Sequence, residues 1–306
     1  GGIERLVLPL GRELQTHGVE STVLAYTADG PFRPVLESAG IQTAFLKSGV
    51  GVQIVLPGRL AVELRRRRVD VLHTHHVGPF LYGGAAALLA RVPHLHTEHS
   101  RELYDVPRRR AIGQVMPRLA RVVTVSEELS AYRALTFGDV AETIRNGVAV
   151  PELPTPATRA AARGALGLPT ETFVSGSVAR LSAEKNPAAL IAALHRIQLP
   201  NARVVLVGDG PERASLVALA ATLGVAERVH FLGVRNDVEA ILPAFDLIAL
   251  TSHREGLPLA LLEGMATGLP VVATAVGGIV DLLSDGGGIM APDGEQNTLA
   301  SALLAY

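Results

Sequence analysis

The chain has 306 residues, a formal net charge of −1 and no cysteine. A chain of this length can bury the core of one large or two ordinary α/β domains. The near-zero charge argues against a general nucleic-acid binder. The lack of cysteine excludes disulfides and cysteine nucleophiles and is compatible with a cytoplasmic protein. Hydrophobic residues make up 48% of the chain, but the longest weakly polar run, residues 79–90, is too short to span a bilayer.

Helical and strand-like patterns alternate along the whole chain. It opens with a helix whose apolar face is made by Ile3, Leu6, Val7, Leu10 and Leu14. Strands are predicted at residues 20–25, 41–46, 69–73, 94–97 and 122–126, and, after a proline-rich stretch, at 173–179, 203–207, 229–232, 247–250 and 270–275. Apolar strands separated by helices indicate parallel sheets with helices on both faces. A linker near residues 148–157 predicts two Rossmann-like domains, residues 1–150 and 151–306.

Two glutamates eight residues apart carry the most information about function. Glu255 follows an apolar strand, and Glu263 lies in a helix that we expect to run from Pro258 to about Thr267, with Gly268 as its stop. Parallel sheets bind ligands at the carboxyl ends of their strands, where helix N-termini favour anions. Two carboxylates with backbone N–H groups between them could therefore bind hydroxyl groups on both sides of a diphosphate. In isolation the same pair could be a capping glutamate and a solvated helix glutamate.

The stretch 253–278 resembles the E-x7-E signature of the retaining glycosyltransferases of family 4. The resemblance implies an α/β protein of the GT-B fold, with two Rossmann-like domains whose parallel sheets face each other across a cleft. It implies that Glu255 holds the transferred sugar and Glu263 the ribose of the nucleotide. It also implies that backbone N–H groups of Gly256 and Leu257 contact phosphate and sugar.

A second group of charged residues follows the first strand of the second domain. Arg180 and Lys185 should leave the carboxyl edge of that strand near Glu255. Two cations that converge on a diphosphate can neutralise its charge without a metal ion. The alternative is an ordinary charged loop between a strand and a helix. The resemblance identifies this pair as the diphosphate-binding arginine and lysine of the family.

Three shorter features extend the resemblance. The turn Gly208–Glu212 is similar to a segment beside the family's nucleotide cleft, although any strand–helix turn can use such glycines. Arg235 occupies the family's base-contact region. The opening Gly1-Gly2 resembles the family's glycine-rich loop, which contacts phosphate and sugar.

The resemblance also bears on the two ends of the chain. The family places a central strand before the glycine-rich loop and continues, after a helix like the one beginning at Leu299, with helices that cross back to the first domain. We therefore expect a fragment of a longer protein, with its first strand and C-terminal helices missing. Alone it should aggregate or lack transferase activity. The stability lost with the missing elements should exceed the free energy of unfolding of a domain, which is roughly 5–15 kcal/mol.

Histidines and arginines gather in the first domain. Six of the ten histidines fall within residues 73–99, and their spacing admits a metal site as in metal-dependent hydrolases, or simple packing. The resemblance instead assigns His75 to the family's active-site histidine near the transferred sugar. The basic runs 65–68 and 108–110 are predicted to be solvated helix ends. The alternative is docking to an anionic membrane surface or a phosphate-bearing lipid acceptor.

The sequence thus predicts a metal-independent retaining hexosyltransferase that uses a UDP- or GDP-linked sugar, with no cofactor and no bound metal. Arg180 and Lys185 stabilise the diphosphate as leaving group, and Glu255, Glu263 and His75 bind the rest of the donor. The acceptor is a glycan, a lipid or a small molecule, in polysaccharide or glycoconjugate synthesis. We place the enzyme in the cytoplasm, with peripheral contact at the inner face of the membrane as a further option. The alternatives are a nucleotide-sugar 2-epimerase of the same fold and a non-catalytic nucleotide-binding subunit.

Overall fold

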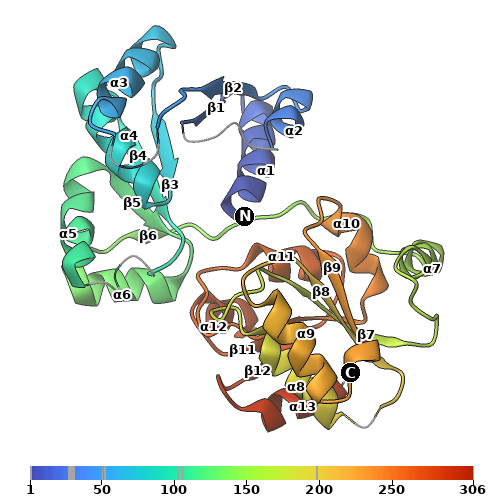
Figure 1. Ribbon diagram of the computed structural model, residues 1–306. Helices are drawn as coiled ribbons and strands as arrows, with labels where there is room; N and C mark the ends of the chain where they lie inside the picture. Colours follow the sequence, from blue (N-terminus) through green and yellow to red (C-terminus); the bar gives the residue numbers. More distant parts are fainter. Residues whose placement is uncertain are drawn as a thin grey trace. The chain divides into compact units, whose positions relative to one another are not determined.

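The computed structural model describes residues 2–26, 32–49, 51, 53–101, 104, 107–197 and 199–305. The chain forms two compact units, Gly1–Asn146 and Gly147–Tyr306 (Figure 1). The sequence analysis placed the boundary between the two domains after residue 150. No regular structure occurs between β6, which ends at Thr143, and α7, which begins at Pro156. This segment overlaps the linker that the sequence predicted.

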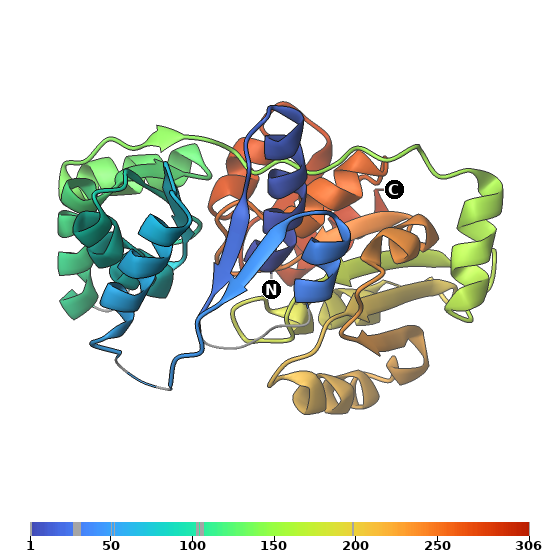
Figure 2. The ribbon, with the colours of Figure 1, turned by 90° about the horizontal axis from the view of Figure 1, so that it is seen from above.

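Unit 1 contains two separate parallel sheets, one ordered β1-β2 and the other β3-β4-β5-β6. Its elements in chain order are α1 (Gly2–Thr16), β1 (Thr22–Ala25), α2 (Arg33–Ser38), β2 (Gln42–Phe45), α3 (Leu56–Arg66), β3 (Leu72–His75), α4 (Val77–Ala90), β4 (His94–Glu98), η2 (Pro107–Arg109), α5 (Arg110–Leu119), β5 (Arg121–Thr124), α6 (Glu127–Phe137) and β6 (Glu142–Thr143). Figure 2 shows β1 and β2 side by side, with α1 and α2 next to them.

Apolar packing joins the two sheets of unit 1. Leu24 and Leu46, which belong to the β1–β2 part, pack against a buried cluster formed by α3 and α4. Tyr26 meets Tyr82 of α4 edge to face, with ring centroids 5.7 Å apart. Strands β1 and β3 do not pair with each other. The strand that the family resemblance places before α1 stays a prediction.

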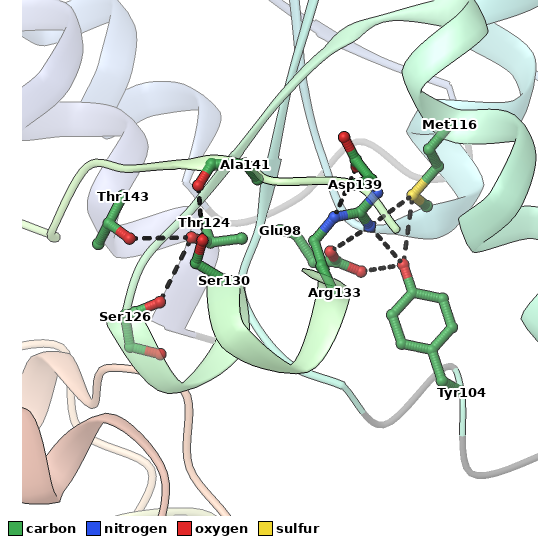
Figure 3. A network of polar contacts seen from close by, with 10 residues as sticks. All are labelled: Glu98, Tyr104, Met116, Thr124, Ser126, Ser130, Arg133, Asp139, Ala141 and Thr143. Atoms are coloured by element: carbon green, nitrogen blue, oxygen red, sulfur yellow. Dashed lines mark hydrogen bonds and ion pairs between the residues drawn. The ribbon is translucent and has the colours of Figure 1, made fainter. Parts of the chain in front are cut away.

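A buried polar network fixes α6 against β4 (Figure 3). Arg133 has a fully buried side chain, and its Nη1 donates to Glu98 Oε2 at 2.7 Å and to the Tyr104 hydroxyl at 3.1 Å. Its Nε donates to Asp139 Oδ2 at 3.1 Å. Burial raises the pKa of Glu98, and the positive charge of Arg133 opposes that rise. Removing Arg133 would leave the buried Glu98 without its cation, and loss of one partner of a buried ion pair typically costs about 3–5 kcal/mol.

Unit 2 is built on one parallel sheet with the order β12-β11-β10-β7-β8-β9. Its elements in chain order are α7 (Pro156–Ala165), β7 (Phe173–Val178), α8 (Pro187–Arg196), β8 (Ala202–Val207), α9 (Arg213–Thr222), η3 (Ala226–Arg228), β9 (Val229–Gly233), α10 (Val238–Ile241), η4 (Leu242–Ala244), β10 (Leu247–Leu250), α11 (Leu259–Ala266), β11 (Val271–Thr274), α12 (Gly278–Leu283), β12 (Gly288–Ala291) and α13 (Gln296–Leu304).

Helices cover both faces of this sheet, as the apolar strands predicted. Along β8, Val204 and Leu206 pack with α8, α9 and α13, whereas Val205 and Val207 pack with the helices of the opposite face. Successive side chains of a strand point to opposite faces, so a strand buried on both sides must be apolar throughout. The prediction missed only short strands, β6 and β12, and placed β3 at residues 69–73 instead of Leu72–His75.

Candidate functional site

The two motifs of the second domain meet at the carboxyl edge of the unit 2 sheet. Strands β7 and β10 are hydrogen-bonded neighbours, so the loops that follow them leave the sheet side by side. The Nζ atom of Lys185, in the first loop, donates to Glu255 Oε1, in the second, at 2.7 Å. The side chain of Glu255 is 8% exposed and that of Lys185 is 26% exposed. The expected proximity of Lys185 and Glu255 is therefore present in the structure.

Buried hydroxyl groups hold these two loops in place, and the sequence analysis did not single them out. Thr251 donates from Oγ1 to the carbonyl oxygen of Asn186 at 2.7 Å, which ties the Lys185 loop to the end of β10. Ser252 donates from Oγ to Glu255 Oε1 at 2.6 Å. Thr274, at the end of β11, donates to the carbonyl of Ser252. The detectable signal was the change from apolar to hydroxyl residues where each strand ends.

Glycines allow the backbone of these loops to pack closely. A Cβ atom on Gly277, whose φ is +52°, would lie 1.9 Å from the carbonyl oxygen of Glu255. A Cβ atom on Gly208 would lie 2.0 Å from the carbonyl oxygen of Ala179, and one on Gly210 2.2 Å from that of Leu181. The Gly208–Glu212 turn therefore packs against the loop that carries Arg180, and only residues without a side chain fit at these contacts.

The other predicted residues of unit 2 lie around the same edge. Arg180 is exposed in the loop after β7, and Glu263 is half-buried on α11, within the helix that the sequence predicted. Gly256 and Leu257 are buried in the loop that connects β10 to α11. Arg235 follows β9 and forms a surface ion pair with Asp237, Nη2 to Oδ2 at 2.6 Å. Its contact with a nucleotide base stays a prediction.

The histidines of unit 1 lie on the two faces of β3 and β4. On one face, the His73 and His75 rings are 4.2 Å apart between centroids, and His75 Nδ1 lies 2.9 Å from His99 Nε2. On the other face, Thr74 Oγ1 lies 2.8 Å from His94 Nε2 and 3.0 Å from His96 Nδ1. The alternation expected for His73 and His75 is confirmed, and hydrogen bonds explain how polar residues fill these buried strands.

Burial lowers the pKa of these imidazoles. It lowers the pKa of His75 and of His96 to about 3, with neighbouring histidines adding to the effect. It lowers the pKa of His73 and of His99 to about 4. Among the residues that the structure describes, no group of three or more His, Cys, Asp or Glu side chains is arranged to hold a metal ion.

The first basic run lies at the end of α3, where Arg65, Arg66 and Arg68 are exposed and Arg67 is half-buried. Arg66 and Arg67 both bind Glu63, at 2.6 and 2.5 Å, and Arg65 donates to the carbonyl of Leu89 at the end of α4. The hydrogen bonds from Arg66 and Arg67 lower the pKa of Glu63 to about 2. In the second run, Arg110 donates to the carbonyl of Tyr104. No described helix combines the length and the apolar character that crossing a membrane requires.

Gly1 lies outside the described residues. Gly2 is the first residue of α1, so the chain enters a helix at the predicted place.

Comparisons with known proteins cover both units. The family model described as Glycosyltransferase Family 4 matches residues 1–150, and that described as Glycosyl transferases group 1 matches residues 158–306. A D-inositol 3-phosphate glycosyltransferase of Stackebrandtia nassauensis is 31% identical over 99% of this chain and 78% of its own length. The chain belongs to glycosyltransferase family 4.

Further relatives agree with this membership. A D-inositol 3-phosphate glycosyltransferase of Mycolicibacterium gilvum is 32% identical to this chain, over 94% of this chain and 72% of the relative's own length. Among solved structures, Anabaena Alr3699/HepE in complex with UDP and glucose is 26% identical, with a TM-score of 0.86 over 100% of this chain and 86% of that one. Its complex with UDP-glucose is 25% identical, with a TM-score of 0.87 over the same shares. The predicted α/β GT-B fold is confirmed.

Proposed function

We propose that this glycosyltransferase moves a hexose from a nucleotide-diphosphate sugar to an acceptor hydroxyl, without a metal ion and with retention of configuration at the anomeric carbon. The observation that carries the proposal is the 2.7 Å contact between Lys185 and Glu255. It joins a cation suited to a diphosphate and a carboxylate suited to sugar hydroxyls at the carboxyl edge of one sheet. The complexes of the Anabaena relative with UDP and UDP-glucose support UDP as the first nucleotide to test.

In this mechanism, charge on the leaving group is neutralised by side chains. Arg180 and Lys185 donate to the diphosphate, and Glu263 accepts hydrogen bonds from the ribose hydroxyls. Glu255 accepts hydrogen bonds from hydroxyls of the donor sugar, and His75 is the histidine that the family resemblance assigns to sugar transfer. Two cations beside the diphosphate stabilise the negative charge that develops on it as the sugar leaves, which lowers the barrier of the reaction.

Retention follows from attack on the face from which the diphosphate departs. The bond between the anomeric carbon and the diphosphate oxygen breaks, the acceptor oxygen forms the new bond, and the acceptor proton passes to the leaving phosphate. Glu255 is already engaged by Lys185 and Ser252. It therefore binds sugar hydroxyls in this scheme and does not attack the anomeric carbon.

The acceptor is a glycan, a lipid or a small molecule, and the names of the curated relatives put D-inositol 3-phosphate first among the compounds to test. Peripheral membrane contact is part of the proposal. Its candidate surface is the basic runs 65–68 and 108–110, in which Arg65, Arg66 and Arg68 are exposed. Liposomes with and without anionic lipid would test this contact in a sedimentation assay.

Calorimetric titration with UDP and GDP in the presence of EDTA tests the nucleotide site. Wild-type protein should bind one of them, and Arg180→Ala and Lys185→Ala should each weaken binding by about 1.5–3 kcal/mol, because each removes a charge-assisted hydrogen bond. Arg196→Ala is the matched control, since Arg196 is an exposed arginine on α8 that binds Asn297. Unchanged affinity in both site variants, or an absolute need for Mn²⁺, would refute the proposal.

The competing functions have their own signatures. Conversion of UDP-GlcNAc without any acceptor would indicate a 2-epimerase, and nucleotide binding without transfer to any acceptor would indicate a non-catalytic subunit. Stoichiometric zinc that a chelator removes would favour a metal-dependent hydrolase built on the histidines. We expect none of these, and we expect His75→Ala to impair transfer.

A further inference from the structure

Ser252 holds the carboxylate of Glu255 from inside the protein. Its side chain is fully buried at the end of β10, with 0% exposure. Its hydroxyl donates to Glu255 Oε1 at 2.6 Å, and Lys185 donates to the same oxygen at 2.7 Å. Neither of these two donors contacts Oε2. Both donors thus hold the carboxylate through Oε1, and in the proposed mechanism Oε2 is the oxygen that accepts a hydrogen bond from a hydroxyl of the donor sugar.

The two donors differ in how they respond to a diphosphate. Lys185 is a flexible cation with a side chain that is 26% exposed, and an arriving diphosphate competes with Glu255 for its ammonium group. The hydroxyl of Ser252 is neutral, turns about a single bond and is shielded from solvent. Thr274 holds the Ser252 carbonyl from the neighbouring strand β11. Ser252 therefore keeps its contact with Glu255 when Lys185 turns toward phosphate.

We propose that Ser252 is the positioning residue that orients Glu255 toward the transferred sugar. This inference rests on the proposed function, in which Glu255 binds that sugar. Without the hydroxyl, Glu255 would be held by Lys185 alone, and donor binding would weaken the one contact that remains. The defect should concern the sugar and spare the nucleotide.

The test compares UDP with UDP-glucose by calorimetry in four proteins: wild type, Ser252→Ala, Ser252→Cys and Ser175→Ala. We expect both Ser252 variants to bind UDP-glucose about tenfold more weakly and to bind UDP within about twofold of wild type, since the lost hydrogen bond involves a charged group. Cysteine keeps the shape of the side chain with a larger sulfur atom and is a weak donor, and alanine removes the donor without adding volume. Ser175, 4% exposed on β7, controls for loss of a buried hydroxyl, and unchanged UDP affinity reports an intact fold.

A double-mutant cycle with Glu255→Gln separates positioning from a general structural effect. If Ser252 acts through Glu255, Ser252→Ala should cause little further loss of UDP-glucose affinity in the Glu255→Gln protein. Additive losses would overturn the inference, and so would normal UDP-glucose binding by both Ser252 variants when Glu255→Gln binds it weakly. If Glu255→Gln itself binds UDP-glucose normally, the role proposed for Glu255 fails instead.

Discussion

Glu255 and Glu263 lie in one loop–helix segment but should bind different parts of the donor. Glu255 is held at the sheet edge by Lys185 and Ser252, whereas Glu263 projects from α11. Of the two glutamates, only Glu263 contacts a part of the donor that free UDP retains, the ribose, in the proposed mechanism. The two residues can therefore be separated by ligand.

We predict that Glu263→Gln weakens binding of free UDP, whereas Glu255→Gln reduces sugar transfer and leaves UDP binding nearly unchanged. The loss for Glu263→Gln should be about 1–3 kcal/mol, because a charged acceptor is replaced by a neutral one. Calorimetry with UDP and a transfer assay measure the two effects. Equal losses of UDP affinity in both variants would show that this division of roles is wrong.

His96 makes the stability of unit 1 depend on pH. It is 2% exposed, and burial lowers its pKa to about 3. An unfolded histidine has a pKa of about 6.5, so the unfolded state binds more protons at pH values between these two. The stabilisation is present above pH 6.5 and is lost as the pH falls from there toward 3. At pH 5 this one group should cost up to about 2 kcal/mol of the free energy of unfolding.

We predict that His96→Asn flattens the pH dependence of stability, since asparagine can still hydrogen-bond to Thr74 but does not gain a proton. Urea unfolding at pH 7.5 and pH 5 measures the slope. His17→Asn is the control, because His17 is exposed at the end of α1. A slope as steep in His96→Asn as in wild type would place the acid sensitivity elsewhere.

At the level of elements, the order of strands brings the site together. Strands β7 and β10 are distant in the chain but adjacent in the sheet, and each ends in a loop with one half of the site. The turn before α12 packs closely against the loop after β10, because Gly277 contacts the carbonyl of Glu255. The position of Glu255 thus depends on the ends of three strands that are neighbours in the sheet, β7, β10 and β11.

We predict that Gly277→Ala destabilises unit 2 and weakens UDP-glucose binding. Positive φ alone costs a non-glycine residue about 1–2 kcal/mol, and here the new Cβ atom would also meet the backbone of Glu255 at 1.9 Å. Gly294→Ala is the matched control, since Gly294 has a φ of +80° with nothing within 4 Å of its Cβ position. Thermal unfolding and calorimetry should show a larger effect for Gly277→Ala, and equal effects would exclude a role for close packing.

For the whole molecule, the two units have separate cores and different chemistry. The buried clusters of unit 2 cover both faces of a six-stranded sheet. Unit 1 contains the four histidines whose pKa burial lowers to about 3 or 4. We therefore expect bound nucleotide to change mainly the stability of unit 2 and acid to change mainly the stability of unit 1.

We predict two thermal transitions that respond independently. UDP at about 100 times its Kd should stabilise unit 2 by about 2.7 kcal/mol and raise only its transition. Lowering the pH from 7.5 to 5 should lower mainly the transition of unit 1, because its buried histidines take up protons on unfolding. Differential scanning calorimetry resolves the two. A single transition moved by both treatments would mean that the units unfold as one.

The sequence by itself determined the elements and the residues of each motif. Strand β10 is apolar throughout and β8 is apolar except for Arg203, and glycine and proline mark the ends of α11, so local sequence patterns are enough to find these elements. Arg180, Lys185 and Glu255 were found in loops after predicted strands and Glu263 in the helix that follows, and the resemblance to the family assigned their roles. Strand β6 has only two residues, too few to show a pattern, and the four residues of β12 begin with glycine, which is depleted in strands.

Only the tertiary structure decided which of these residues meet. Lys185 and Glu255 are 70 positions apart, and their contact exists because β10 pairs with β7. Ser252 and Thr274 acquire their roles in the same way, since the change from apolar to hydroxyl residues at a strand end marks these positions but does not tell which groups they will bond. Strand order depends on burial summed over a whole sheet. No short segment of sequence contains that information.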